Sequence, residues 1–322
     1  MVVGRWPVAV TVVAALGVAG VAAAVPTTIS TGATASVPAK RLRPPGPRIG
    51  DCSIFPASNA WNREIASAPL HPLSAQIIAH INSVGGKFVH PDVGSTFGIP
   101  FVVVPASEPL VPVTYDPYGD ESDPGPFPIP LTAPVEAGSD AHVLALRQGT
   151  CELFELFGAQ STPTGWLAQS GAKFDLKTGV LRTIGFTSAD AAGLPILPGL
   201  VRYDEVAAGL IDHAIRVTFS KTQRGFVLPA THFASNSSDA TLPAMGMRLR
   251  LSASFDIGSL TGQAKIIATA MQRYGLIVAD NGSNWFFQGA PNPGWNDSDL
   301  DQLKRIPGSA FEVVDTGAVQ PG

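Results

Sequence analysis

The sequence predicts a mainly β protein, an antiparallel sandwich or irregular barrel with two or three peripheral helices, with an α+β fold as the alternative. The 322 residues include 33 Gly and 29 Pro, but only 14% are charged. This composition suits a chain with many turns better than a helical bundle. The apolar segments are mostly short, and the clearest of them alternates apolar with polar residues, as half-buried strands do.

The first half of the chain is expected to contain one helix followed by strands. Over Pro72–Asn82 the side chains of Ile77, Ile78 and Ile81 share one face, and a Gly-Gly pair then ends the helix. Strands are expected at 99–105, 111–115, 142–147, 152–157 and 173–176. The second of these is expected to pair with the first, and the third and fourth to form a hairpin. Asp116–Gly138 is a long acidic, Pro-rich loop, and such loops are usually functional or mobile.

The second half is expected to add further strands and two helices. Leu249 and Leu251 alternate with Arg248 and Arg250, which predicts a strand with one solvated face. Helical spacing over 261–274, followed by Gly275, predicts a helix with a glycine end. The remaining elements are expected as strands at 214–219, 225–228, 276–280 and 311–314, one or two helical turns at 204–211 and a short helix at 298–303.

The chain begins with the pattern of an export signal. Arg5 precedes an almost wholly apolar run, and Ala22-Ala23-Ala24 offers the small residues that a signal peptidase reads, so residues 1–24 are predicted to be removed. An uncleaved membrane anchor is the alternative. Residues 25–50, rich in Pro, Thr and Ala, are predicted to form a flexible spacer, and residues 51–322 a single globular domain. The mature protein is therefore expected to be secreted, with no stable membrane span.

Cys52 and Cys151 are the only cysteines, and both lie in the part predicted to be exported. An even count in an oxidising compartment predicts a disulfide between them, with two free thiols as the alternative. The net charge of −4 argues against a nucleic-acid partner, because phosphates require a basic face.

Four segments resemble those of an uncharacterised family of secreted proteins from soil bacteria, especially actinobacteria. The longest segment reads SADAAGLPILPGLVRYDE at 188–205, and the others are HPD at 90–92, VADNGSNW at 278–285 and PGSAFE at 307–312. The resemblance spans roughly Asp51–Asp315 and implies export and a single folding unit in a bacterial protein. It implies no particular reaction.

The candidate chemistry comes from acidic residues beside turns, because the sequence has no nucleophile elbow, zinc-protease, phosphate-loop or dinucleotide motif. Asp280 ends an apolar strand, where partial burial raises a carboxyl pKa toward the range of a general acid. Asn281 and Asn284 could bond sugar hydroxyls, and Trp285 could stack on a sugar ring. The alternative is an ordinary turn in front of core aromatic residues.

A second candidate segment is Arg202-Tyr203-Asp204-Glu205, in which Asp204 or Glu205 could partner Asp280 while Arg202 and Tyr203 bind substrate. An N-terminal helix cap is the alternative for the two acids.

His90 and Asp92 form the third candidate and could contribute from an opposing loop. A metal site that combines this pair with His142, His213 or His232 lacks any diagnostic spacing, and no metal or cofactor is expected. The acids of loop 116–123 are interpreted as solvated rather than calcium-binding.

These observations favour a secreted carbohydrate-active protein acting on an extracellular polysaccharide or cell-wall glycan. The leading hypothesis is a glycoside hydrolase with paired carboxylates. A polysaccharide lyase with His232 or Tyr203 as base is a variant of that hypothesis. The alternatives are a non-catalytic binding protein using Trp61, Trp166, Trp285 and Trp295 as platforms, and a structural envelope protein.

Overall fold

The computed structural model describes residues 46–322, which belong to one compact unit. The predicted export signal and residues 25–45 of the predicted spacer lie outside the described residues. The folded part starts ahead of Asp51, where the sequence placed the beginning of the domain, because Arg48–Ile49 already pairs with Cys52–Ser53 as a two-stranded ribbon.

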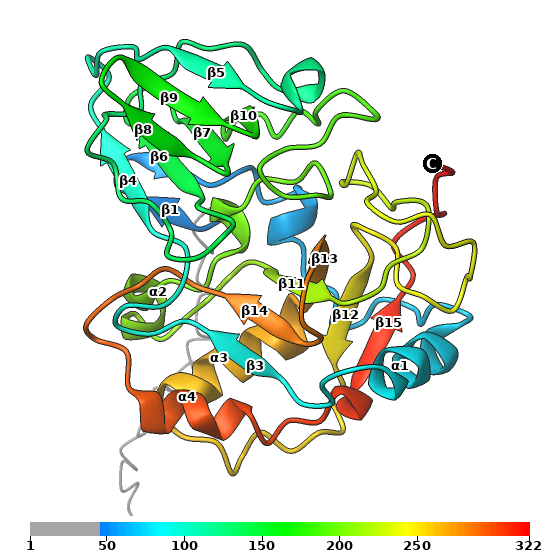
Figure 1. Ribbon diagram of the computed structural model, residues 1–322. Coiled ribbons are helices and arrows are strands. Elements are labelled where there is room, and N and C mark those ends of the chain that lie inside the picture. Colours follow the sequence, from blue (N-terminus) through cyan, green and yellow to red (C-terminus); the bar gives the residue numbers. More distant parts are fainter. Residues whose placement is uncertain (1–45) are drawn as a thin grey trace, which may run out of the picture. The chain divides into compact units, whose positions relative to one another are not determined.

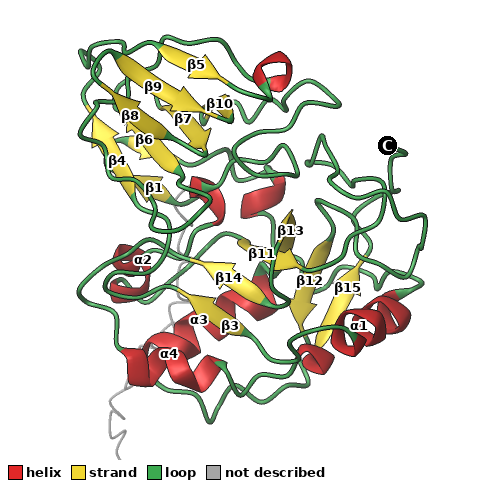
Figure 2. Ribbon diagram, in the orientation of Figure 1, coloured by secondary structure: helices red, strands yellow, loops and turns green. Residues whose placement is uncertain are grey.

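The mainly β fold class is confirmed, with helices at the periphery of several sheets and no closed barrel among the described residues (Figures 1 and 2). The strands are β1 (Arg48–Ile49), β2 (Cys52–Ser53), β3 (His90–Asp92), β4 (Phe101–Val104), β5 (Val113–Tyr115), β6 (Val143–Arg147), β7 (Glu152–Phe157), β8 (Gln160–Thr162), β9 (Gly165–Ala168), β10 (Ser170–Asp175), β11 (Ile215–Phe219), β12 (Arg248–Leu251), β13 (Leu276–Asn281), β14 (Phe286–Gln288) and β15 (Phe311–Val314). The α-helices are α1 (Ser74–Ser83), α2 (Tyr203–Ala207), α3 (Gly262–Arg273) and α4 (Asp297–Leu303).

The largest sheet has the strand order β15-β12-β13-β11-β14-β3 and is mixed. Strand β13 runs parallel to β11, and β14 runs parallel to β3, while the other neighbours are antiparallel. Helix α3 packs against β12, α1 against β15 and α4 against β3, so helices cover the sheet and its two edge strands. Gly275 has a φ of +70° directly before β13, and this left-handed conformation ends the α3 segment as expected.

Two smaller sheets form a sandwich, with orders β10-β7-β6-β4 and β5-β9-β8. Val143 and Ala145 of β6, Phe154 and Leu156 of β7, and Trp166 of β9 share one buried cluster between them. The opposite face of β6 and β7 packs on the main core, so this sheet is buried on both sides. Double burial explains the nearly continuous apolar sequence of these strands.

Several expected elements differ in detail from the structure. Residues 111–115 supply β5, which pairs with β9 and not with the strand at 99–105. Residues 225–228 form no strand, because only Phe226 makes isolated bridges. The expected solvated face of β12 is largely covered: Arg248 is 2% exposed and donates hydrogen bonds to the carbonyl oxygens of Ala60 and Tyr274.

The predicted disulfide is confirmed. Cys52 and Cys151 are bonded across a sequence separation of 99 residues, and both are buried. The bond links β2 to the turn between β6 and β7. A buried disulfide is typical of extracellular proteins. None of the helices within residues 46–322 is long and apolar enough to cross a membrane.

Candidate functional site

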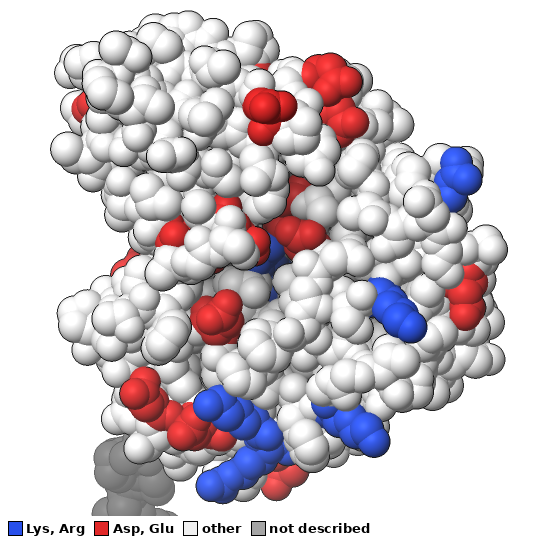
Figure 3. Space-filling model, viewed as in Figure 1, with Lys and Arg blue, Asp and Glu red and all other residues white. Residues whose placement is uncertain are grey.

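A pocket of about 330 Å³ lies at the carboxyl end of β13. Segments far apart in the chain enclose it: the long loop after β5, the β7 and β10 ends, residues 187–191, and residues 232–234. Figure 3 shows a hollow in the middle of this face, with acidic atoms gathered around it and a basic group at its bottom. Its lining combines two carboxylates, a histidine, two aromatic rings and three hydroxyl groups: Glu121, Asp280, His232, Tyr118, Phe157, Ser170, Thr187 and Ser188.

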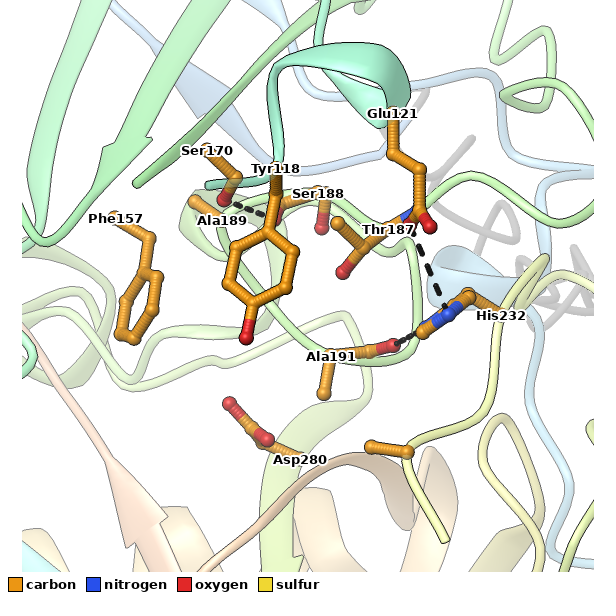
Figure 4. A pocket seen from close by; sticks show the side chains of 11 residues that line it. Tyr118, Glu121, Phe157, Ser170, Thr187, Ser188, Ala189, Ala191, His232 and Asp280 are labelled. Carbon is orange, nitrogen blue, oxygen red and sulfur yellow. Dashed lines mark hydrogen bonds and ion pairs between the residues drawn. The ribbon is translucent and has the colours of Figure 1, made fainter. Parts of the chain in front are cut away.

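Asp280 lies at the base of this pocket, at the exit of the apolar strand β13, and points into the cavity (Figure 4). Burial raises the pKa of its carboxyl to about 8, with a second contribution from the nearby carboxylate of Asp190. Arg216 opposes this rise in pKa without cancelling it. Asp280 is therefore mostly protonated at neutral pH, which is the state that a general acid requires.

A fully buried ion pair lies beneath Asp280. Arg216 of β11 donates from Nε to Oδ2 of Asp190 at 3.0 Å and from Nη2 to Oδ1. Its Nη1 donates to Oε1 of Gln288 on β14. Asp190 is 0% exposed and Arg216 2% exposed, so both charges depend on this fork of hydrogen bonds for compensation.

Glu121 enters the pocket from the side opposite Asp280, on a 3₁₀ turn at Gly119–Glu121 (Figure 4). Its Oε2 accepts a hydrogen bond from the backbone N–H of Thr187 at 3.2 Å and lies 3.8 Å from Nε2 of His232. Nδ1 of His232 donates to the carbonyl oxygen of Ala191 at 2.7 Å, which fixes the ring. Thr187 and His232 thus hold the carboxylate of Glu121 on one side of the pocket, and the protonated carboxyl of Asp280 lies on the other.

More ionisable groups are buried outside the pocket lining. His142 bonds Glu136, and although burial lowers the pKa of His142, this contact outweighs it and raises the pKa. Glu155 of β7 is 0% exposed and accepts hydrogen bonds from the backbone N–H groups of Ile196 and Leu197. Burial raises the pKa of Glu155 to about 7 despite these two bonds.

The residues expected to bind sugar beside Asp280 lie elsewhere. Trp285 is 1% exposed and donates from Nε1 to Oδ1 of Asn82 at 2.9 Å. Asn284 is also buried and bonds the carbonyl oxygen of Ile81. Asn281 is exposed, and its side-chain amide bonds Ser235 and Thr222. Trp285 and Asn284 therefore connect the strand end to α1 and cannot contact a ligand in the pocket.

The second expected segment forms its own cluster on α2. Arg202 is 1% exposed and pairs with Glu205, which also lies 3.1 Å from Nε2 of His213. Burial raises the pKa of Glu205, but His213 and Arg202 outweigh burial and lower it. Asp204 is exposed, and Tyr203 packs edge-on against Trp295. None of the four residues lines the pocket, so the structure does not bring Asp204 or Glu205 to Asp280 as expected.

His90 and Asp92 lie on β3 and line a different cavity, shared with residues of α4. His90 stacks on Phe286, with ring centroids 4.0 Å apart. Burial raises the pKa of Asp92, and the carboxylate of Glu136 adds to this rise. The pair contributes nothing to the lining of the pocket at Asp280.

The remaining expectations concern metals and aromatic platforms. Within residues 46–322, no group of three His, Cys, Asp or Glu side chains could hold a metal ion. In the acidic loop, Asp123 pairs with Arg182 and accepts from the Lys173 backbone N–H, which attaches the loop to β10. The four tryptophans expected to serve as platforms are all buried: Trp61, Trp166, Trp285 and Trp295.

Sequence reasoning missed Asp190, Arg216 and Glu155, and treated Glu121 only as a possible calcium ligand. Arg216 carried a usable signal, because an arginine within the apolar segment 214–219 requires a buried acidic partner. Nothing local identifies Asp190 as that partner.

Comparison of the chain with protein-family models, with curated proteins and with solved structures gives no match. The case for any function therefore rests on the geometry and chemistry of the pocket.

Proposed function

We propose that the protein is an exported glycoside hydrolase in which Asp280 is the general acid and Glu121 the second carboxylate. A glycosidic bond between them would receive a proton from Asp280 on its leaving oxygen. Glu121 would act from the opposite side as base or nucleophile. The observation that carries the proposal is an open pocket with a protonated carboxyl on one side and a separately held carboxylate on the other.

The rest of the lining favours a neutral sugar. The hydroxyl groups of Ser170, Thr187 and Ser188 already donate to backbone carbonyl oxygens, so they offer a sugar uncharged acceptors only. The exposed ring of Tyr118 offers the flat face that the buried Trp285 cannot. Among the described residues that line the pocket there is no Lys or Arg, and the nearby Arg216 is already paired with Asp190. A lyase acting on uronic acids needs groups that neutralise the substrate carboxylate, so hydrolysis is the better supported reaction.

The burial of four tryptophans weakens the alternative of a non-catalytic binding protein, because such a protein was expected to display them as platforms. Binding without cleavage nevertheless remains an outcome that the test distinguishes.

The test incubates the purified, disulfide-bonded protein with neutral polysaccharides, uronic-acid polymers and purified cell walls. New reducing ends and bound protein are measured in the same samples. We expect cleavage of a neutral glycan. The Asp280→Asn and Glu121→Gln variants are each expected to lose about 10²–10⁴-fold in kcat. Asp204→Asn, which changes an exposed carboxylate outside the pocket, is the matched control and should retain full activity.

Full activity in folded Asp280→Asn or Glu121→Gln would remove that residue from the proposed pair. Binding without release of reducing ends would replace the hydrolase with a binding protein.

A further inference from the structure

Asp190 is a fully buried carboxylate paired with an arginine. Its two carboxylate oxygens accept hydrogen bonds from Nε and Nη2 of Arg216. The side chain of Gln288 accepts a third bond from Nη1 of the same guanidinium. With both Asp190 and Arg216 out of solvent, neither can rotate away without leaving a buried charge unpaired. Asp190 is therefore held as the ionised member of any carboxyl pair it joins.

Asp280 is the other member of such a pair. The backbone N–H of Ala192 donates to the carbonyl oxygen of Ala279 at 3.0 Å, which holds the Asp190 loop against the end of β13, and a side-chain hydrogen bond joins the two carboxyl groups there. Two carboxyl groups can bond in this way only if one of them carries a proton, because an ionised carboxylate has no donor. Arg216 commits Asp190 to the ionised form, so the proton lies on Asp280. In addition, Oδ1 of Asp280 accepts from the Asn281 backbone N–H at 2.6 Å, which further limits rotation of the carboxyl.

We propose that Asp190, clamped by Arg216, is a positioning residue that retains the proton on Asp280 and holds that carboxyl at the base of the pocket. The proposed function supplies the use of that proton as a general acid. The proposed location of the proton rests on the pairing of Asp190 with Arg216 and on the contact between the two carboxyl groups, and it can be tested without any substrate.

Other charged groups face this pair from the surrounding elements. Glu121 and His232 lie across the pocket and interact with each other. Glu155 on β7 and His142, which directly precedes β6, also interact with Asp190, and each has hydrogen-bond partners of its own. Glu136 acts on Arg216 and is bonded to His142. Of the nearby carboxylates, only Asp190 bonds Asp280, so Asp190 is the one whose removal should change the titration of Asp280.

The experiment follows the carboxylic-acid C=O band by infrared spectroscopy across pH, and assigns the band of Asp280 by its loss in Asp280→Asn. In the wild-type protein, this carboxyl should stay protonated to about pH 8. In Asp190→Asn, the like charge is gone and Arg216 is free to attract Asp280. The midpoint should then fall by about one to three pH units. The alkaline limb of the kcat/KM profile should move by the same amount.

Glu155→Gln is the matched control, because it neutralises a buried carboxylate of the same region that does not bond Asp280. In this variant, the pH at which the Asp280 carboxyl is half ionised should remain near the wild-type value. A merely structural role for Asp190 would lower stability in Asp190→Asn while leaving the midpoint in place, and that result overturns the proposal.

If Asp190→Asn does not fold, titration of the wild-type protein still tests where the proton lies. An Asp280 carboxyl that is ionised at pH 6 would contradict the proposal. A wild-type midpoint near pH 8 that falls in Asp190→Asn, without cleavage of any glycan, would support the positioning pair and count against the hydrolase.

Discussion

Glu155 offers a direct test of the electrostatics inside the fold, through the variant Glu155→Gln. Burial raises the pKa of this carboxyl from its ordinary value of 4.5 to about 7, against the opposing effect of the Ile196 and Leu197 N–H groups. Because the folded pKa is the higher one, the folded state binds the extra proton. The contribution of protonated Glu155 to the free energy of unfolding is therefore complete below about pH 4.5 and is lost as the pH rises through about 7. A shift of this size corresponds to roughly 3 kcal/mol in the free energy of unfolding.

The assay is urea unfolding of both proteins from pH 5 to pH 9. At pH 5 the variant should match the wild type or be slightly less stable, since the amide oxygen of Gln can still accept from the two N–H groups. By pH 9 it should gain up to about 3 kcal/mol relative to the wild type. Asp280 and Asp92 also titrate, but they are present in both proteins, so the difference between the two curves isolates position 155.

Glu152→Gln, three residues earlier on β7, provides a control of opposite sign. Partial burial pushes the pKa of Glu152 up, but the Lys173 ammonium, 2.6 Å away, prevails and lowers it. The stability that Glu152 contributes is therefore lost only as the pH falls below about 4.5, so the difference between Glu152→Gln and the wild type should stay constant from pH 5 to pH 9. A stability difference between Glu155→Gln and the wild type that stays constant from pH 5 to pH 9 would refute the reasoning about burial.

Three further changes test the pocket and the core. Tyr118→Ala should raise KM by roughly three- to tenfold, a loss of about 1 kcal/mol of ring contact, with urea unfolding nearly unchanged; an unaltered KM would exclude stacking on this exposed ring. Trp285→Ala should cost about 3–5 kcal/mol in unfolding free energy because the ring is buried; weaker glycan binding at unchanged stability would contradict its place in the core. Replacing Cys52 and Cys151 with Ala should lower stability by up to about 4–5 kcal/mol in the same assay, since the bond closes a loop of about 100 residues; an unchanged urea midpoint would show that the bond does not constrain the unfolded chain.

Much of the fold could be predicted where the pattern is local. The helix α3, the β6–β7 hairpin and the apolar strand β13 carry their own periodicity and turn residues, and each is present. The three-residue strands β3 and β14 could not be predicted, because they exist only through pairing with each other and with β11. The prediction of which strands pair fails for the same reason, as β5 shows: its residues pair with residues of β9 that lie 53 positions later, as in Val113 with Trp166.

The candidate site was predictable only in part. Asp280 was identified correctly as a partly buried acid, because an acid at the end of an apolar strand is placed at the boundary of the core. Glu121 was not assigned to the same pocket, since the loop that carries it has no periodicity, and its position depends on contacts such as Asp123 with Arg182.

The misassigned partner reveals a physical difference between two kinds of charged residue. Arg202, directly before α2, and Glu205 within it are three positions apart and pair with each other, so a dense run of charges can be satisfied locally without building a pocket. Arg216, Asp190 and Asp280 stand among apolar or small neighbours, and none has an opposite charge within three positions along the chain. A buried charge in that situation must find a partner across the fold. Isolated charges in apolar segments are therefore the residues that the folding of this chain brings together, and at the end of β13 they converge on one pocket.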